Sequence, residues 1–257
     1  MLFSALLFVA ACAYDDEAVP DYVEHPVDEI YNEALNVLQD GNFERATTMF
    51  DEVERQHPYS TWATKAQLMS AYSLYQDNSY GDAVLALDRF ILLHPSNSDV
   101  PYAYYLKALC YYERISDITR DQEMTKLAMQ TMSKLVRRFP SSKYAKDVKL
   151  KMDLTRDHLA GKEMEIGRYY LKQGHHLAAI NRFRSVVDDY QSTTHVPEAL
   201  HRLAEAYVAL GVELEAQKVA AVLGHNFPGS EWYLDAYSLV EGKLIKPAQD
   251  DPWYKLW

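Results

Sequence analysis

The chain has 257 residues, of which 48% are hydrophobic and 25% are charged, and it contains only nine glycines. This composition supports a sizeable buried core and excludes an intrinsically disordered chain. The net charge of −11 argues against nucleic acid as a partner, because phosphate binding requires a basic stripe, and none is evident along the chain. There are only two cysteines, Cys12 and Cys110, so packing rather than a disulfide framework must hold the fold together.

The first residues of the chain have the pattern of an export signal. Residues 1–11 form an uncharged apolar run that ends in small residues directly before Cys12. The segment Val9–Cys12 resembles the bacterial lipobox, in which a peptidase cuts before the cysteine and the thiol receives a diacylglycerol. By that resemblance, residues 1–11 are a signal peptide, Cys12 carries a diacylglycerol and an acyl chain, and residues 12–27 form a polar tether. The alternatives are an ordinary signal peptide cut elsewhere, or a buried N-terminal helix.

From residue 28 onward the chain repeats a helix–turn–helix pattern. Small residues, an aromatic residue and a terminal proline recur at matching offsets, and Pro58 and Pro95 mark the ends of two consecutive units. We expect five repeats followed by a final helix, at residues 28–60, 61–97, 100–141, 143–192, 195–229 and 230–241. The offsets resemble those of the tetratricopeptide repeat, in which small residues let paired helices approach closely. The predicted fold is therefore all-α, a solenoid of five repeats with a concave groove.

Two repeats depart from the regular pattern, and the segment after the last repeat has none. The third repeat contains about eight extra residues, 115–123, which we expect to form a loop on one face. The fourth begins with Lys143–Ala160, whose helical apolar spacing predicts a long first helix that joins the two halves. Residues 242–257 lose periodicity and hold two prolines, which predicts a flexible aromatic tail. Its Trp253, Tyr254 and Trp257 form a docking motif or pack on the last repeat.

The chain has 20 tyrosines against eight phenylalanines, and many of them fall on one stripe of the repeats. Positions two, five, nine, twelve and thirteen of each repeat are expected to face the groove. In the first three repeats these positions hold six tyrosines, Tyr31, Tyr72, Tyr75, Tyr102, Tyr105 and Tyr112, together with Lys65. In the last two repeats they include Arg168, Glu198, His201 and Glu205, so the two halves of the groove differ in chemistry. A tyrosine lane suits an extended or aromatic-ended peptide; the alternative is that tyrosine only fills the core.

The sequence contains no catalytic constellation, so we expect a protein that is not an enzyme. His175 and His176 are adjacent, and His201 with Glu205 has the i, i+4 spacing of a metal pair, but neither pair has a third ligand nearby. Zinc-protease, paired-cysteine, serine-hydrolase and phosphate-loop motifs are also missing from the sequence. Cys110 lies at an apolar helix position and is expected to be a buried small hydrophobe. We expect neither metal nor cofactor, apart from the lipid on Cys12.

The lipobox followed by five repeats resembles the BamD family of outer-membrane assembly lipoproteins over nearly the whole chain. The stretches that carry the resemblance are Glu29–Tyr31, Leu87–Ile91, Ser133–Arg137 and Ile180–Arg182. The resemblance implies a lipid anchor on the periplasmic face of a Gram-negative outer membrane and a place in the machine that inserts β-barrel proteins. It implies as partners the BamA-like barrel subunit, bound through its periplasmic domains, other assembly-complex lipoproteins, and unfolded outer-membrane proteins.

The resemblance also suggests roles for particular residues. The N-terminal groove would receive the substrates' C-terminal signal, whose aromatic end would meet Tyr31, Tyr72, Tyr75, Tyr102 and Tyr105. Lys65 or Arg89 would then be available for the terminal carboxylate. Arg182 matches an arginine that lies at the barrel-subunit contact in the family, and Arg184 is close enough to take its place. The competing functions are an exported scaffold for cell-wall or division enzymes, and a repeat domain that regulates an enzyme.

Overall fold

A computed structural model describes residues 24–241, and within this range every regular element is a helix. The helices are α1 (Val27–Gln39), α2 (Phe43–Gln56), α3 (Thr61–Gln76), α4 (Tyr80–Leu93), α5 (Val100–Tyr112), α6 (Glu123–Arg138), α7 (Lys143–Lys172), α8 (His176–Asp189), α9 (Val196–Ala209), α10 (Glu213–Asn226) and α11 (Glu231–Val240). Five helix pairs and a final helix follow one another, and each lies within one of the ranges expected for the repeats, apart from Val27 at the start of α1. The all-α prediction is confirmed.

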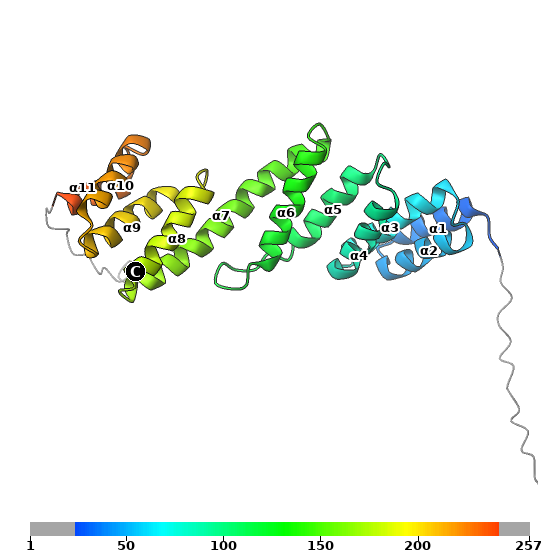
Figure 1. Ribbon diagram of the computed structural model, residues 1–257. Helices are drawn as coiled ribbons and strands as arrows, with labels where there is room; N and C mark the ends of the chain where they lie inside the picture. Colours follow the sequence, from blue (N-terminus) through cyan, green and yellow to red (C-terminus); the bar gives the residue numbers. More distant parts are fainter. Residues whose placement is uncertain (1–23, 242–257) are drawn as a thin grey trace, which may run out of the picture.

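The helices stack in chain order into an elongated array (Figure 1). Each helix packs on the next, and each odd-numbered helix also contacts the next odd-numbered one. Among the described helices, no two even-numbered ones make such a contact. The odd-numbered helices therefore lie closer together and form the inner, concave layer of the solenoid, as expected for stacked repeats.

Four of the five turns inside the helix pairs are built on one backbone conformation. Gly41, Gly174 and Gly211 follow the ends of α1, α7 and α9 with φ of 79°, 75° and 72°, and Asn78 takes the same place after α3 with φ of 60°. A residue in this left-handed region ends a helix and turns the chain back, and glycine or asparagine adopts it at the lowest cost.

The apolar cores follow the helix pairs, and α7 belongs to two of them. Val148 and Met152, in its first half, join the core built by α3, α4, α5 and α6. Ala160 and Met164, in its second half, join the core of α8 and α9. At 30 residues α7 is about 45 Å long. The prediction of a long helix that joins the two halves is therefore confirmed.

The extra residues of the third repeat form a loop, as predicted, and the loop packs on the middle of α7. The carbonyl of Ser116 lies 2.8 Å from Nε2 of His158, and Lys162 Nζ donates to the carbonyl of Thr119 at 3.0 Å. The connection between α8 and α9 also docks here, since Asp157 of α7 accepts hydrogen bonds from the backbone and hydroxyl of Thr194 at 3.1 and 2.8 Å. Two connecting segments therefore brace the point where the halves of the array meet.

Several expectations concern residues outside the described range. The signal peptide 1–11, the lipidated Cys12 and the tail 242–257 all lie there. Of the helices in residues 24–241, none is long and apolar enough to cross a bilayer. Cys110 is buried in α5, and burial raises the pKa of its thiol to about 12, so it is the inert core residue that the sequence predicted.

Candidate peptide-binding groove

Tyrosines from three consecutive repeats meet on the concave side of the array. Tyr102 and Tyr105 of α5 lie with their ring centroids 6.5 Å apart, and the ring of Tyr144, at the start of α7, lies 5.4 Å from the first and 5.1 Å from the second. Tyr72 and Tyr75 of α3 pack against the same apolar core as these three residues. These five half-buried residues are called the tyrosine groove below.

Polar neighbours orient the hydroxyls of the tyrosine groove. The hydroxyl of Tyr105 donates to Oδ2 of Asp147 at 2.9 Å, and Gln76 donates to the hydroxyl of Tyr72 at 2.7 Å. Burial, followed by the hydrogen bond to Asp147, raises the pKa of Tyr105 to about 12. Burial also raises the pKa of Tyr102 and Tyr75. All three hydroxyls therefore stay neutral at physiological pH, and the rings offer apolar contact to a ligand. The hydroxyls of Tyr102 and Tyr75 can donate hydrogen bonds to that ligand, whereas the hydroxyl proton of Tyr105 is already donated to Asp147.

Tyr31, Arg89 and Lys65 differ in how well they fit the expected groove. Tyr31 is only 9% exposed, because its ring packs 5.5 Å from Phe50 and 4.9 Å from Trp62, so it belongs to the core of the first repeat. Arg89 pairs with Glu54 at 2.5 Å and lines a depression with Gln67 and Ser70. Gln67 and Ser70 lie on the side of α3 opposite Tyr72, so Arg89 faces away from the tyrosine groove. Lys65 is exposed two turns before Tyr72 on the same stripe of α3.

At the other end of the tyrosine groove, α7 contributes residues that the sequence analysis did not single out. Tyr112 is half-buried, with Lys151 Nζ 5.3 Å from the centre of its ring. Tyr144, Asp147 and Lys151 occupy positions two, five and nine counted from Lys143, where α7 begins. The same rule that found the other tyrosines would have found these. The unusual length of α7 hides the start of this repeat in the sequence, so these three positions do not stand out as groove positions there.

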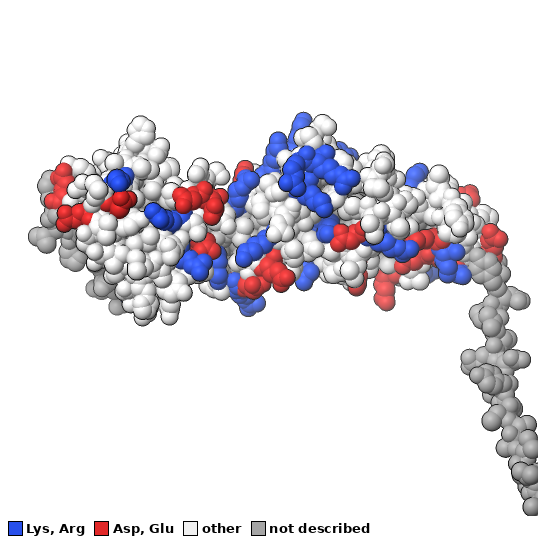
Figure 2. Space-filling view, in the orientation of Figure 1, with Lys and Arg blue, Asp and Glu red and all other residues white. Residues whose placement is uncertain are grey.

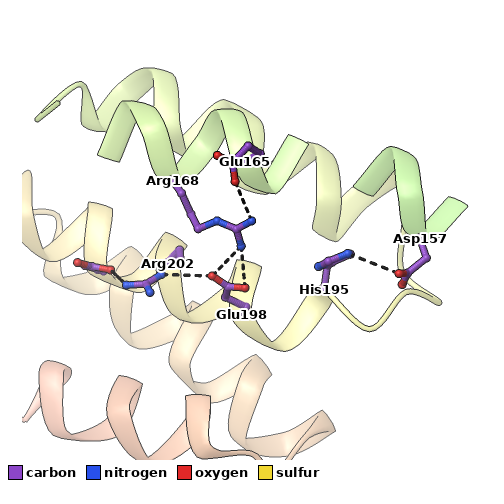
Figure 3. Close-up of polar contacts among 7 residues, drawn as sticks. Asp157, Glu165, Arg168, His195, Glu198 and Arg202 are labelled. Carbon is purple, nitrogen blue, oxygen red and sulfur yellow. Dashed lines mark hydrogen bonds and ion pairs between the residues drawn. The ribbon is translucent and has the colours of Figure 1, made fainter. Parts of the chain in front are cut away.

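The C-terminal half of the concave side carries ion pairs in place of tyrosines (Figure 3). Nη1 of Arg168 in α7 bonds both carboxylate oxygens of Glu198 in α9, at 3.1 and 3.0 Å, and its Nη2 bonds Glu165 at 3.2 Å. Arg202 lies 3.6 Å from Glu198 and donates to Glu205 at 2.8 Å. This chain of charges joins α7 to α9 and confirms that the two halves differ in chemistry.

Arg182 and Arg184 lie on α8, away from the tyrosine groove. Arg182 donates to Glu163 of α7 at 3.0 Å and borders a depression of about 390 Å³ that is also lined by loop residues 119–122 and Tyr190. Arg184 is exposed, and no ion pair involving it is found in the described part of the chain. Arg184 is therefore free to meet a partner, whereas Arg182 is held in place by Glu163.

The histidines show no sign of a metal site. His201 is buried with its ring 5.4 Å from that of Trp232, and burial lowers its pKa, so the ring is neutral and packs on α11. Within residues 24–241 no group of three possible metal ligands comes together.

Comparison with known proteins gives consistent matches over most of the chain. Residues 23–223 match a family described as YfiO, outer membrane lipoprotein. An outer membrane protein assembly factor BamD from Caulobacter vibrioides is 49% identical over 227 residues, which are 88% of this chain and 74% of that protein. Proteins of the same name from Rickettsia prowazekii and Neisseria meningitidis are 46% and 33% identical over 93% and 98% of this chain, and each match covers 96% of the relative.

Proposed function

The chain belongs to the BamD family of outer-membrane protein assembly factors, and from this premise we propose that its tyrosine groove receives the C-terminal segment of unfolded outer-membrane β-barrel proteins. The chain is a non-enzymatic scaffold that serves the assembly of outer-membrane proteins. The groove is the part of this scaffold that would meet the substrate.

One observation carries the proposal, namely the convergence of tyrosines from α3, α5 and α7 on the concave side. An extended segment that ends in an aromatic residue needs ring contacts for that residue and hydrogen-bond donors for its backbone carbonyls. Tyr102, Tyr105 and Tyr144 offer three rings within 6.5 Å of one another, and the hydroxyls of Tyr102 and Tyr75 are neutral donors. Tyrosine loses little conformational entropy when it makes such contacts, since it has only two rotatable side-chain bonds.

The terminal carboxylate of the segment would be received by Lys65. Its ammonium is exposed and unpaired by any carboxylate of the described residues, and it rests 5.2 Å from the Trp62 ring centre. Arg89 is less suited, because Glu54 already compensates its charge on another side of α3.

The C-terminal half would dock on the barrel subunit of the assembly complex through α8. Arg184 would contribute an uncompensated guanidinium, and Arg182, held by Glu163, would shape the surface beside it. We further propose that Cys12 carries the lipid anchor at the periplasmic face of the outer membrane, and that other lipoproteins of the complex bind the same scaffold.

The groove is tested with a fluorescent peptide that ends in phenylalanine and is taken from the last residues of an outer-membrane barrel protein. We expect Tyr102→Leu with Tyr105→Leu to weaken binding of this peptide at least tenfold, measured by fluorescence anisotropy, because the area of two aromatic rings and the hydroxyl donor of Tyr102 are lost. The matched control is Tyr59→Leu with Tyr169→Leu, since both of these tyrosines are exposed and lie outside the groove. Equal affinity of the groove variant and the control would rule the groove out.

The role of Lys65 is tested with the same peptide carrying either a free or an amidated C-terminus. Wild type should prefer the free carboxylate severalfold, and Lys65→Gln should lose that preference while it binds the amidated peptide as wild type does. If the preference persists in Lys65→Gln, another cation receives the carboxylate.

A further inference from the structure

The turn between α6 and α7 carries a concentration of positive charge that the tyrosine groove does not explain. From Lys134 to Lys151 the chain has seven lysines and arginines and one carboxylate, in a protein whose net charge is −11. Figure 2 shows lysine and arginine side chains gathered over the α6–α7 turn. We call this surface the basic hairpin, and its cations are Lys134, Arg137, Arg138, Lys143, Lys146, Lys149 and Lys151.

Most of these charges have no carboxylate partner. Six of the seven residues are exposed, and in the described part of the chain only Lys151 lies within ion-pair distance of a carboxylate, 3.9 Å from Asp147. Lys134 and Arg138 rest over the ring of Tyr104, at 5.3 and 5.8 Å from its centre. Such ring contacts orient a cation without cancelling its charge. The basic hairpin is therefore left with uncompensated positive charge.

Helix electrostatics explain part of this cluster and not the rest. Arg137 and Arg138 stand in the last turn of α6, where the helix dipole favours cations. Lys143 and Lys146 stand in the first turn of α7, where the dipole disfavours them, and no acidic residue is present there. These lysines lower the stability of the helix, which is understandable if they bind an anionic surface outside the chain.

We propose that the basic hairpin binds the anionic phospholipid headgroups of the membrane beside which the protein works. The family is described as outer membrane lipoprotein, which places a lipid surface near the chain. Five of the seven cations are lysines. The ammonium group of lysine is a mobile point charge that suits a fluid array of headgroups, whereas arginine is better suited to one fixed carboxylate. Leu150 and Leu154, 67% and 56% exposed on α7, add apolar side chains that can enter the headgroup region.

The acidity of the rest of the chain does not prevent this contact. At physiological salt, charges are screened beyond about 8 Å. The array is much longer than that, since α7 alone extends about 45 Å. A bilayer that approaches the hairpin therefore meets mainly the local positive charge and is repelled by the acidic parts only at close range. The proposal rests on the membrane association of the family and is independent of the tyrosine groove.

The test uses the full chain with Cys12→Ser, which can carry no acyl group, and sedimentation with vesicles. Vesicles contain either phosphatidylcholine alone or 30% phosphatidylglycerol in phosphatidylcholine. We expect binding only to the anionic vesicles, and loss of binding at high salt. Each basic residue near an anionic surface strengthens binding about fivefold, so Arg137→Gln, Lys146→Gln and Lys149→Gln together should weaken it about a hundredfold. The matched control is Arg45→Gln, Lys126→Gln and Lys172→Gln, which changes the net charge equally at exposed sites elsewhere.

The outcomes separate this proposal from its competitors. Normal binding of the barrel-derived peptide by the triple variant would show that the variant is folded and that the groove acts separately. The proposal is overturned if wild type ignores anionic vesicles, if the control triple weakens binding as much as the hairpin triple, or if phosphatidylcholine vesicles bind equally well. Binding of a fluorescent polyglutamate peptide without vesicle binding would assign the basic hairpin to an acidic polypeptide instead.

Discussion

Single glycines decide how closely the helices of a pair approach. A Cβ atom built on Gly167 would lie 2.5 Å from Cε1 and 2.8 Å from Cδ1 and Cζ of Phe183, which is completely buried in α8. A Cβ atom built on Gly161, six residues earlier in α7, would have as its nearest neighbour Nε2 of the half-exposed His195, at 3.3 Å. The ring of Phe183 therefore occupies the space that a methyl group on Gly167 would need. A methyl group on Gly161 would fit after a small shift of His195.

Replacing each of these glycines by alanine should therefore affect stability differently. Gly167→Ala should lower the free energy of unfolding by about 1–2 kcal/mol, because overpacking against Phe183 costs more than the helix propensity gained, which is about 1 kcal/mol. Gly161→Ala should leave stability unchanged or raise it, since the ring of His195 can shift. Denaturation in urea, monitored by circular dichroism, measures both variants; equal effects would show that the two sites are equivalent.

The sequence predicted such positions well and charged positions poorly. Gly167, Ala179 and Phe183 stand at repeat offsets, and those offsets exist because close packing requires a small residue opposite a ring. Tyr31 also stands at a groove offset, yet it turned out to be in the core, because Trp62 of the next repeat covers it. Whether a neighbour is large enough to cover a side chain depends on tertiary packing, which a repeat template does not contain. The direction of Arg89 likewise depended on Glu54, 35 residues away in the sequence.

At the scale of elements, the ion pairs of the C-terminal half attach α9 to α7. Arg168 makes three hydrogen bonds to carboxylates on two helices, and the side chain of Glu198 is only 16% exposed. A largely buried carboxylate that loses such a partner keeps its desolvation cost without compensation. This contact is therefore more important for stability than the exposed ion pairs along the helix surfaces.

We expect Arg168→Ala to lower the free energy of unfolding by about 1–3 kcal/mol, since charge-assisted hydrogen bonds to a half-buried group are lost. Arg168→Lys should recover only part of this, because the single nitrogen of an ammonium cannot reach Glu198 and Glu165 together, as the two terminal nitrogens of the guanidinium do. Arg156→Ala, which breaks an exposed pair with Asp153 in the same helix, is the control and should cost less than about 0.5 kcal/mol. Hydrogen exchange should rise in α9 for Arg168→Ala alone, and a uniform rise along the array would contradict this assignment.

At the scale of the whole molecule, α7 is the helix that couples the folding of the two halves of the array. Repeat arrays are stabilised by contacts between neighbours only, so cooperativity must pass along the chain of interfaces. Here two separate cores share one continuous helix, with Val148 and Met152 on one side of the junction and Ala160 and Met164 on the other. The sequence predicted this helix from its apolar spacing. It did not reveal that loop 115–122 and Thr194 would brace its middle, because loop docking leaves no periodic signal.

The sequence analysis did not predict the basic hairpin. The seven cations stand in one short segment, and a local count of charge between residues 134 and 151 would have found them. The overall charge of −11 conceals a basic cluster that is confined to one turn. Net charge describes the average surface, whereas recognition depends on one face.

Breaking α7 in its middle should uncouple the two halves. Arg156→Pro removes a backbone hydrogen bond and introduces a clash with the preceding turn, at a cost of about 3 kcal/mol. We expect differential scanning calorimetry to show two transitions where Arg156→Ala shows one, since each half keeps its own core. A single transition at lower temperature would instead mean that the halves remain coupled through the docked loop and Thr194.

The buried thiol of Cys110 has a practical consequence for measuring such motions. Its pKa of about 12 and its position inside α5 protect it from alkylating reagents at neutral pH. Once Cys12 is acylated or replaced, any cysteine introduced at the surface becomes the first thiol to react with a maleimide dye. Pairs of dyes placed on the two halves of the array would then report by energy transfer how far it bends when a substrate segment or a membrane binds, with the native core left unaltered.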